Sequence, residues 1–183
     1  MTTEEQFRQV MAMCREVFVA KLHDYGAAWR ILRIPSLTDQ LYIKANRIRS
    51  LEVKSKSLVG EGIMPEFVAI VNYAVIGLIQ LCHGVADKPD DMSADEALAE
   101  YDRLAEQSLQ LMLRKNHDYD EAWRGMRVSS YTDLILQKIF RTKQIEVLGD
   151  EELLASEGID ANYMDMMNYA AFALIKLNFG DTL

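Results

Sequence analysis

The 183-residue sequence predicts an all-α protein of about six helices, a tandem duplication of a three-helix unit that forms a pseudo-twofold bundle. Three observations support this prediction. A long motif occurs twice in the same order, a helix-capping signal opens each copy, and no stretch alternates polar and apolar residues convincingly enough to indicate a β-strand.

The duplication is visible residue by residue. Residues 21–30 (KLHDYGAAWR) return 94 positions later as residues 115–124 (KNHDYDEAWR), and 14 of the 32 positions from 21 to 52 are identical in the second copy. After a two-residue insertion the spacing becomes 96. The triplet EGI then occurs at 61–63 and 157–159, and the triplet NYA at 72–74 and 168–170.

The repeat divides the chain into three segments. We assign residues 1–83 to copy one, 84–92 to a polar, proline-bearing linker and 93–183 to copy two, with both copies in one compact bundle. A chain of this length can bury a substantial core.

The first helix of each copy is expected to open with a capping box, in which two side chains three residues apart satisfy backbone N–H groups reciprocally. These helices are expected to end near Asp24 and Asp118, before a loop that carries a Tyr and a Trp. The two boxes pair Thr3 with Gln6 and Ser93 with Glu96.

The second helix of each copy is expected to begin after Ser36/Thr38 in copy one and after Ser130/Thr132 in copy two. That start places Asp39 and Asp133 in the first turn, where the helix dipole favours a carboxylate.

The third helix is the most apolar part of copy one. It is predicted from about Pro65 to Cys82, with a counterpart over 160–178. Asn72 and Gln80 interrupt the apolar run, which is also short for a membrane span. We therefore expect a buried bundle helix and no contact with a membrane.

The composition excludes several classes of protein. A formal net charge of −8 repels nucleic-acid backbones, so no polymeric nucleic acid partner is expected, whereas a small anionic ligand is compatible with local Lys and Arg clusters. Cys14 and Cys82 show no pairing pattern and are expected to be reduced thiols. The N-terminal MTTEEQFRQV has no basic region followed by an apolar run, so we expect no signal peptide and a cytoplasmic protein.

Polar residues that both copies retain are candidates for a site. Lys21 and Lys115 are candidates for contact with phosphate, and Asp24 and Asp118 for ligands of a divalent cation. The alternative is helix termination, with lysines near the negative helix end. The His-Asp doublet is also the core of the HD phosphohydrolases, but no histidine precedes His23 to supply a further ligand.

Aromatic residues adjoin these charged groups in both copies. Tyr25 and Trp29 recur as Tyr119 and Trp123. Aromatic faces beside basic groups can stack a nucleobase, which makes these four residues candidates for base stacking. The alternative is that they plug the end of the bundle.

Cations recur on the second helix as well. Lys44 and Arg47 return as Lys138 and Arg141, and the spacing of three places both members of a pair on one helical face. Arg124 lies just upstream. Because Arg suits bidentate phosphate contact and Lys acts as a point charge, we predict contacts with phosphate. The alternative is a solvated face or salt bridges to the third helix.

Amides recur inside the apolar third helix. Asn72 and Asn168 must be hydrogen-bonded there to offset their burial. Asp165 lies one turn before Asn168 and Glu157 lies eleven residues before it, so all three fall on one side of an ideal helix. Such oxygen ligands suit Mg²⁺ that bridges phosphates. The alternative is an Asn bonded to a neighbouring backbone, with Glu157 and its counterpart Glu61 capping loops.

Three motifs occur in order along the chain: Lys-x-x-Asp-Tyr-Gly, then Lys-x-x-Arg, then Glu followed by Asp-x-x-Asn-Tyr. Together they resemble the family called nucleotide modification associated domain type one. The resemblance occurs twice and covers nearly the whole chain. That family in turn resembles the MazG-like all-α NTP pyrophosphohydrolases and the dimeric dUTPases. Those enzymes bind Mg²⁺ through Glu-x-x-Glu and Glu-x-x-Asp on consecutive helices. Asp165 and Asn168 fall at the second motif, whereas Lys-x-x-Arg replaces the first.

The resemblance implies a Mg²⁺-dependent nucleotide pyrophosphohydrolase, in which the two repeats form the pair that simpler relatives make by dimerising. Glu157, Asp165 and Asp118 would hold Mg²⁺ while Lys138 and Arg141 neutralise phosphates. The missing Glu-x-x-Glu favours the alternative, a nucleotide-binding or regulatory protein without turnover. An HD-type phosphohydrolase or a purely structural bundle comes third, and a homodimer is left open.

The two copies differ at one informative position. Only copy two carries an acid, Asp165, where copy one has Ala69. Since a hard cation needs several anionic oxygens, we expect one competent metal–nucleotide site in copy two and a weakened one in copy one.

Overall fold

The computed structural model describes residues 1–54, 62–149 and 157–180. These residues form six α-helices and two short 3₁₀ helices without any β-strand, which confirms the all-α prediction. Copy one contains α1 (Thr3–Tyr25), η1 (Ala28–Ile31), α2 (Ile34–Lys54) and α3 (Met64–His83). Copy two contains α4 (Ala94–Tyr119), η2 (Ala122–Gly125), α5 (Val128–Leu148) and α6 (Ile159–Phe179).

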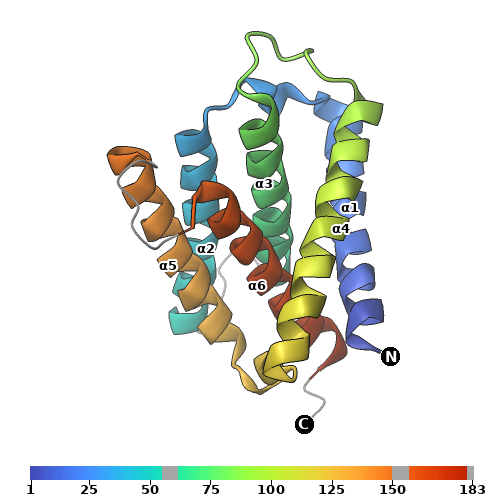
Figure 1. Cartoon of the computed structure of the whole chain (residues 1–183), viewed down its shortest axis with the longest axis vertical. Coiled ribbons are helices and arrows are strands. Elements are labelled where there is room, and N and C mark those ends of the chain that lie inside the picture. Colours follow the sequence, from blue (N-terminus) through green and yellow to red (C-terminus); the bar gives the residue numbers. More distant parts are fainter. Residues whose placement is uncertain (55–61, 150–156, 181–183) are drawn as a thin grey trace.

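The two most apolar helices, α3 and α6, lie at the centre of the bundle and share its most extensive contact (Figure 1). On one flank α2 packs on α5, and on the other α1 packs on α4. Every helix of copy one therefore contacts its own counterpart in copy two, as a twofold axis between the copies requires.

Reciprocal ion pairs cross this axis between α2 and α5. Asp39 pairs with Lys143 at 3.5 Å, and Asp133 pairs with Arg49 at 3.9 Å. Asp39 corresponds to Asp133 in the repeat, and Arg49 corresponds to Lys143. The pseudo-twofold relation thus extends from the backbone to individual side chains.

The predicted capping box of α1 is wrong by one residue. The N-cap is Thr2, paired with Glu5, because Thr3 and Gln6 instead bond to Arg124 of copy two. The box that begins α4, Ser93 with Glu96, is confirmed.

The second helices begin earlier than predicted, at Ile34 and Val128. Pro35 is compatible with the first turn of a helix, because proline lacks only an N–H that would have no partner there. Asp39 and Asp133 therefore lie beyond the first turn, where they form the ion pairs across the axis.

Helix α3 is long and apolar enough to pass a length-and-composition test for a membrane span, but 72% of its most apolar stretch is buried in the bundle. Burial of this kind is typical of the core helix of a soluble protein. α3 and α6 approach closely at Gly77, where an added Cβ would collide with the ring of Tyr163. The two thiols, buried Cys14 and exposed Cys82, are both free.

Candidate functional site

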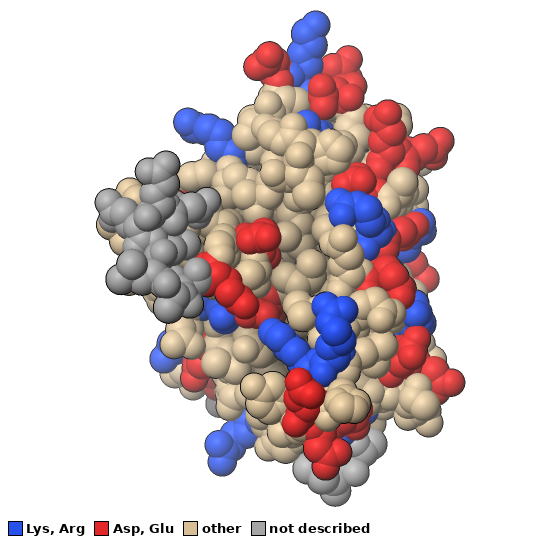
Figure 2. All heavy atoms as spheres, viewed as in Figure 1, with Lys and Arg blue, Asp and Glu red and all other residues tan. Residues whose placement is uncertain are grey.

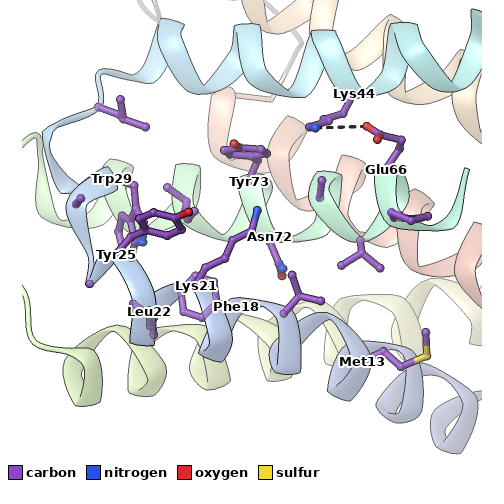
Figure 3. Close-up of a pocket in the computed structure, with 18 of the residues that line it drawn as sticks. Met13, Phe18, Lys21, Leu22, Tyr25, Trp29, Lys44, Glu66, Asn72 and Tyr73 are labelled. Carbon is purple, nitrogen blue, oxygen red and sulfur yellow. Dashed lines mark ion pairs between the residues drawn. The ribbon is translucent and has the colours of Figure 1, made fainter. Parts of the chain in front are cut away.

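A cavity of about 800 Å³ lies inside copy one, between α1, α2 and α3, with η1 at one end (Figure 3). Most of its wall is apolar. The wall includes Val17, Phe18, Leu22, Leu32, Val68 and Ile76. Its polar groups are few and come from all three helices, an arrangement typical of small-molecule sites.

One end of the cavity is aromatic. Tyr25 ends α1 and is 74% exposed, so its ring lies at the mouth of the cavity. Gly26 then takes a positive φ of 61°, which turns the chain into η1 and brings Trp29 into the wall. Tyr73 of α3 lies farther along the cavity, between these two rings and Lys44 (Figure 3).

The other end of the cavity is charged. Glu66, near the start of α3, is only 4% exposed and is paired with Arg47 and, at 3.5 Å, with Lys44. Its Oε2 atom, the oxygen that faces Lys44, is buried and has no hydrogen-bond partner among the described residues. This end therefore combines cations with one buried carboxylate.

Lys21 extends from α1 into the middle of the cavity (Figure 3). Within the part of the chain that the structure describes, its ammonium group has no ion-pair or hydrogen-bond partner. Lys21 is an exposed residue, so its ammonium group can be reached from solvent.

Asn72 has a structural role in addition to lining the cavity. Its Nδ2 donates to the Cys14 carbonyl at 3.0 Å, and its Oδ1 accepts from the Tyr101 hydroxyl at 2.8 Å. Asn168 likewise donates to the Ser108 carbonyl, at 3.4 Å. Cys14 and Ser108 correspond in the repeat, so both amides hold the third helix to the first helix of the same copy, as the structural alternative predicted.

In copy two the corresponding charges neutralise one another. Asp165, 8% exposed, pairs with Lys115 at 3.1 Å and with Lys138 at 2.9 Å. Burial disfavours the charged form of Lys138, but the hydrogen bond that its ammonium group donates to Asp165, together with the negative charge of Asp165, outweighs burial and raises the pKa of the ammonium group. The two lysines predicted to bind phosphate thus already have an internal anion.

Of the two candidate aromatic residues of copy two, the tryptophan is buried and the tyrosine is exposed. Trp123 is 6% exposed and stacks on Phe172, with ring centroids 4.3 Å apart and planes within 9°. The guanidinium of Arg124 lies 4.4 Å from the centre of the Trp123 ring. At the position of Phe172, copy one has the smaller Ile76, which lines the cavity. Tyr119 is 71% exposed.

Arg124 serves the bundle rather than a cavity. It donates to Thr3 (2.5 Å) and Gln6 (2.8 Å) at the start of α1. Its counterpart Arg30 is buried and donates to Gly84 (2.6 Å) and Asp91 (3.2 Å) in the segment before α4. Arg124 therefore holds the beginning of α1, whereas Arg30 holds the linker that leads to α4.

The predicted metal ligands are not brought together. Asp24, Asp118 and Glu157 are exposed, and Asp165 is engaged by two lysines. No group of three His, Cys, Asp or Glu side chains comes close enough to hold an ion within the residues described. Glu61 lies outside the described residues.

Three remaining candidates have local contacts. His23 and His117 each contact only the adjacent aspartate among the contacts described, at 3.1 and 3.3 Å, and both lie on the exposed end of a helix. Arg141 donates to Gln144 at 3.2 Å.

A family model described as nucleotide modification associated domain 1 matches residues 21–81 and 115–177, which together make up more than half of the chain. The chain belongs to the nucleotide modification associated domain 1 family. Both matches begin at the Lys of the repeated motif, so the family unit is present twice, in agreement with the predicted duplication. No curated protein and no solved structure matches the chain.

Within this family unit, sequence reasoning missed Glu66. The search for residues shared by both copies passed over it, because the corresponding position holds Asn162. The available signal was a carboxylate that follows Pro65 at the start of an apolar helix, which also fits an ordinary first-turn acid.

Proposed function

We propose that this protein binds a nucleotide in the cavity of copy one, with the base against Tyr25 and Trp29 and the phosphates toward Lys21 and Lys44. The observation that carries the proposal is Lys21, a cation without a described partner in a cavity with an aromatic end. A volume of about 800 Å³ falls within the range of about 300–1,000 Å³ that is usual for small-molecule sites.

The arrangement of the two ends supports a ligand of this shape. Figure 3 shows Lys21 in the middle of the cavity, with Tyr25 and Trp29 on one side of it and the Lys44–Glu66 pair on the other. An aromatic group at one end and a phosphate near the two lysines suit this order of groups along the cavity. The family description, which links the domain to nucleotide modification, supports the same ligand class.

A small nucleotide suits the surface better than a nucleic acid polymer does. Figure 2 shows acidic and basic side chains interspersed over the face in view, without a continuous basic field. With a net charge of −8, the protein offers attraction to phosphate only locally. Free thiols at Cys14 and Cys82 support a cytoplasmic location.

Calorimetric titration with nucleosides and with their mono-, di- and triphosphates tests the proposal. Lys21→Ala should weaken nucleotide binding roughly tenfold or more, since a charge-assisted hydrogen bond is worth about 1.5–3 kcal/mol. Nucleoside binding should change little. The matched control is Lys115→Ala, which should leave binding unchanged because Lys115 is occupied by Asp165.

The opposite pattern would support the site predicted in copy two. In that case Lys115→Ala, or the double change Lys138→Ala with Arg141→Ala, would reduce affinity while Lys21→Ala would not. Failure of the wild-type protein to bind any nucleotide or nucleoside would reject the proposal.

A second candidate function is Mg²⁺-dependent hydrolysis of the bound nucleotide, which the buried Oε2 of Glu66 favours. Mg²⁺ is commonly held by one or two carboxylates together with substrate phosphates, so a single carboxylate facing the cavity is compatible with an ion that arrives with the ligand. Pyrophosphate release should then require Mg²⁺ and be lost in Glu66→Gln. Binding without release would assign the protein to the non-catalytic class.

A further inference from the structure

We propose that the anionic group of the ligand binds over Ala69, between Lys21 and Lys44, at the place that the carboxylate of Asp165 holds in copy two. The inference rests on the proposed function and adds the position and chemistry of its phosphate subsite. The carboxylate of Asp165 in copy two thus occupies the position that corresponds to the proposed site of the ligand's anionic group in copy one.

Two ion pairs of Asp165 define this position in copy two. Asp165 Oδ1 faces Lys115 at 3.1 Å, and Oδ2 faces Lys138 at 2.9 Å. Each carboxylate oxygen therefore has its own ammonium group. An anion with two terminal oxygens on one central atom reproduces this arrangement, and a terminal phosphoryl group is such an anion.

The same three positions line the cavity of copy one. Lys21 corresponds to Lys115, Lys44 to Lys138, and Ala69 to Asp165. Lys21, Lys44 and Ala69 all belong to the cavity wall. Because alanine replaces the acid, the two lysines keep their places on equivalent helices but lose the anion that connects them in copy two.

The remaining charges of copy one do not replace that anion. Glu66 lies one helical turn before Ala69 and is shared between Lys44 and Arg47, so its negative charge is already balanced. Lys21 has no counter-ion among the described residues. The subsite thus keeps a net positive charge, which an anionic group entering from solvent can neutralise.

The decisive variant is Ala69→Asp, which installs the copy-two carboxylate in copy one. It should weaken binding of a nucleoside triphosphate roughly tenfold or more while leaving the corresponding nucleoside within about twofold. Ala69→Asn is the matched control, because it has the same size without the charge and should weaken triphosphate binding much less. Thermal unfolding of all three proteins checks that each variant is folded.

Two results would overturn the inference and leave the proposed function in place. One is wild-type affinity of Ala69→Asp for the triphosphate. The other is tighter binding of Ala69→Asp in the presence of Mg²⁺, which would make position 69 a metal-ligand position instead of an anion subsite.

The reverse variant tests the equivalence independently of the copy-one fold. Asp165→Ala removes the carboxylate that joins Lys115 to Lys138. Copy one has no carboxylate at the corresponding position, Ala69. With inorganic phosphate as the probe, the wild-type protein should show one binding event and Asp165→Ala two. A single event in the variant would contradict the proposed equivalence, since Lys115 is half exposed and reachable from solvent.

Discussion

Copies one and two share a fold, a motif and most of their charged residues. Among the residues that the structure describes, each copy has one buried carboxylate, and the two carboxylates lie one helical turn apart in the repeat. In copy one it is Glu66, and in copy two it is Asp165, at the position that corresponds to Ala69. Glu66 pairs with cations of α2 alone, whereas Asp165 connects α5 to α4 through Lys138 and Lys115. Moving one acid by three residues therefore decides whether the lysine of the first helix is available to a ligand.

A second difference reinforces the first. Trp123 lies flat on Phe172 and fills the interior of copy two, while Trp29 is only partly buried beside the smaller Ile76. After a duplication, one copy can hold a bundle together while the other keeps a cavity. The arrangement suggests that division of roles, and it can be tested residue by residue.

The largest effect is expected at the tryptophans. Trp123→Ala should lower the free energy of unfolding by about 3–5 kcal/mol, because it removes a large buried ring and leaves a cavity. Trp29→Ala should cost clearly less stability but weaken nucleotide binding, since base stacking contributes about 1–3 kcal/mol. Chemical denaturation and titration of both variants measure the two effects. Equal loss of stability at both positions would remove this part of the contrast.

The next largest effects are expected at the corresponding arginines, Arg30 and Arg124. Arg30→Met keeps the apolar stem but leaves the Gly84 carbonyl without its charged donor, at an expected cost of about 1.5–3 kcal/mol. Arg124→Met should cost less, because the side chain of Arg124 is 19% exposed and that of Arg30 only 4%. Denaturant unfolding at pH 7 gives both values. A larger loss for Arg124→Met would show that exposure does not rank these contacts.

Much of the fold could be predicted from local signals. The capping box of Ser93, Pro65 at the start of α3 and the repeated motif define helices that the structure confirms. The error at the start of α1 has a tertiary cause, since Thr3 and Gln6 face Arg124 from the other copy. No pattern within the first ten residues could reveal that contact.

The site was less accessible to sequence reasoning, because identity between copies selects what the copies share. Asn72 and Asn168 are shared because they form hydrogen bonds between helices. Arg124 has a counterpart in copy one, Arg30, and it holds α1 to copy two. Among the described residues, Lys21 lacks a carboxylate partner because the two copies differ at one position, where copy one has Ala69 and copy two has Asp165. The consequence of this difference follows only once the structure places Asp165 between two lysines.

A further contrast concerns the crossing of α3 and α6. Gly77→Ala should destabilise the protein by about 1–3 kcal/mol, because a Cβ at this position meets the buried ring of Tyr163. At a Tm shift of about 2–4 °C per kcal/mol, that predicts a fall of several degrees. Ala173→Gly, at the corresponding position, should cost only about 0.5–1 kcal/mol through helix propensity. Comparable losses for the two changes would mean that the crossing is not tightly packed at Gly77.

The smallest effect is expected at two related carboxyl groups between α2 and α5. Burial raises the pKa of Glu146 above its ordinary value of 4.5, against the opposing hydrogen bond from Thr38 at 2.6 Å. Burial likewise raises the pKa of Glu52, which faces Thr132. The folded protein therefore binds protons more tightly than the unfolded chain at both positions. The stability that this contributes is complete below pH 4.5 and is lost as the pH rises through the raised folded-state pKa.

Glutamine mimics the protonated form, so Glu52→Gln and Glu146→Gln should each stabilise the protein slightly at pH 7, within about 0.5 kcal/mol, and make no difference near pH 4. Glu106→Gln is a control of opposite sign, because hydrogen bonds from Arg8 lower the pKa of Glu106 and its contribution is lost as the pH falls. Thermal melts of the three variants and wild type between pH 4 and pH 8 measure these differences. If the glutamine variants at 52 and 146 gave unequal shifts, the pseudo-twofold relation would not extend to the electrostatics of this interface.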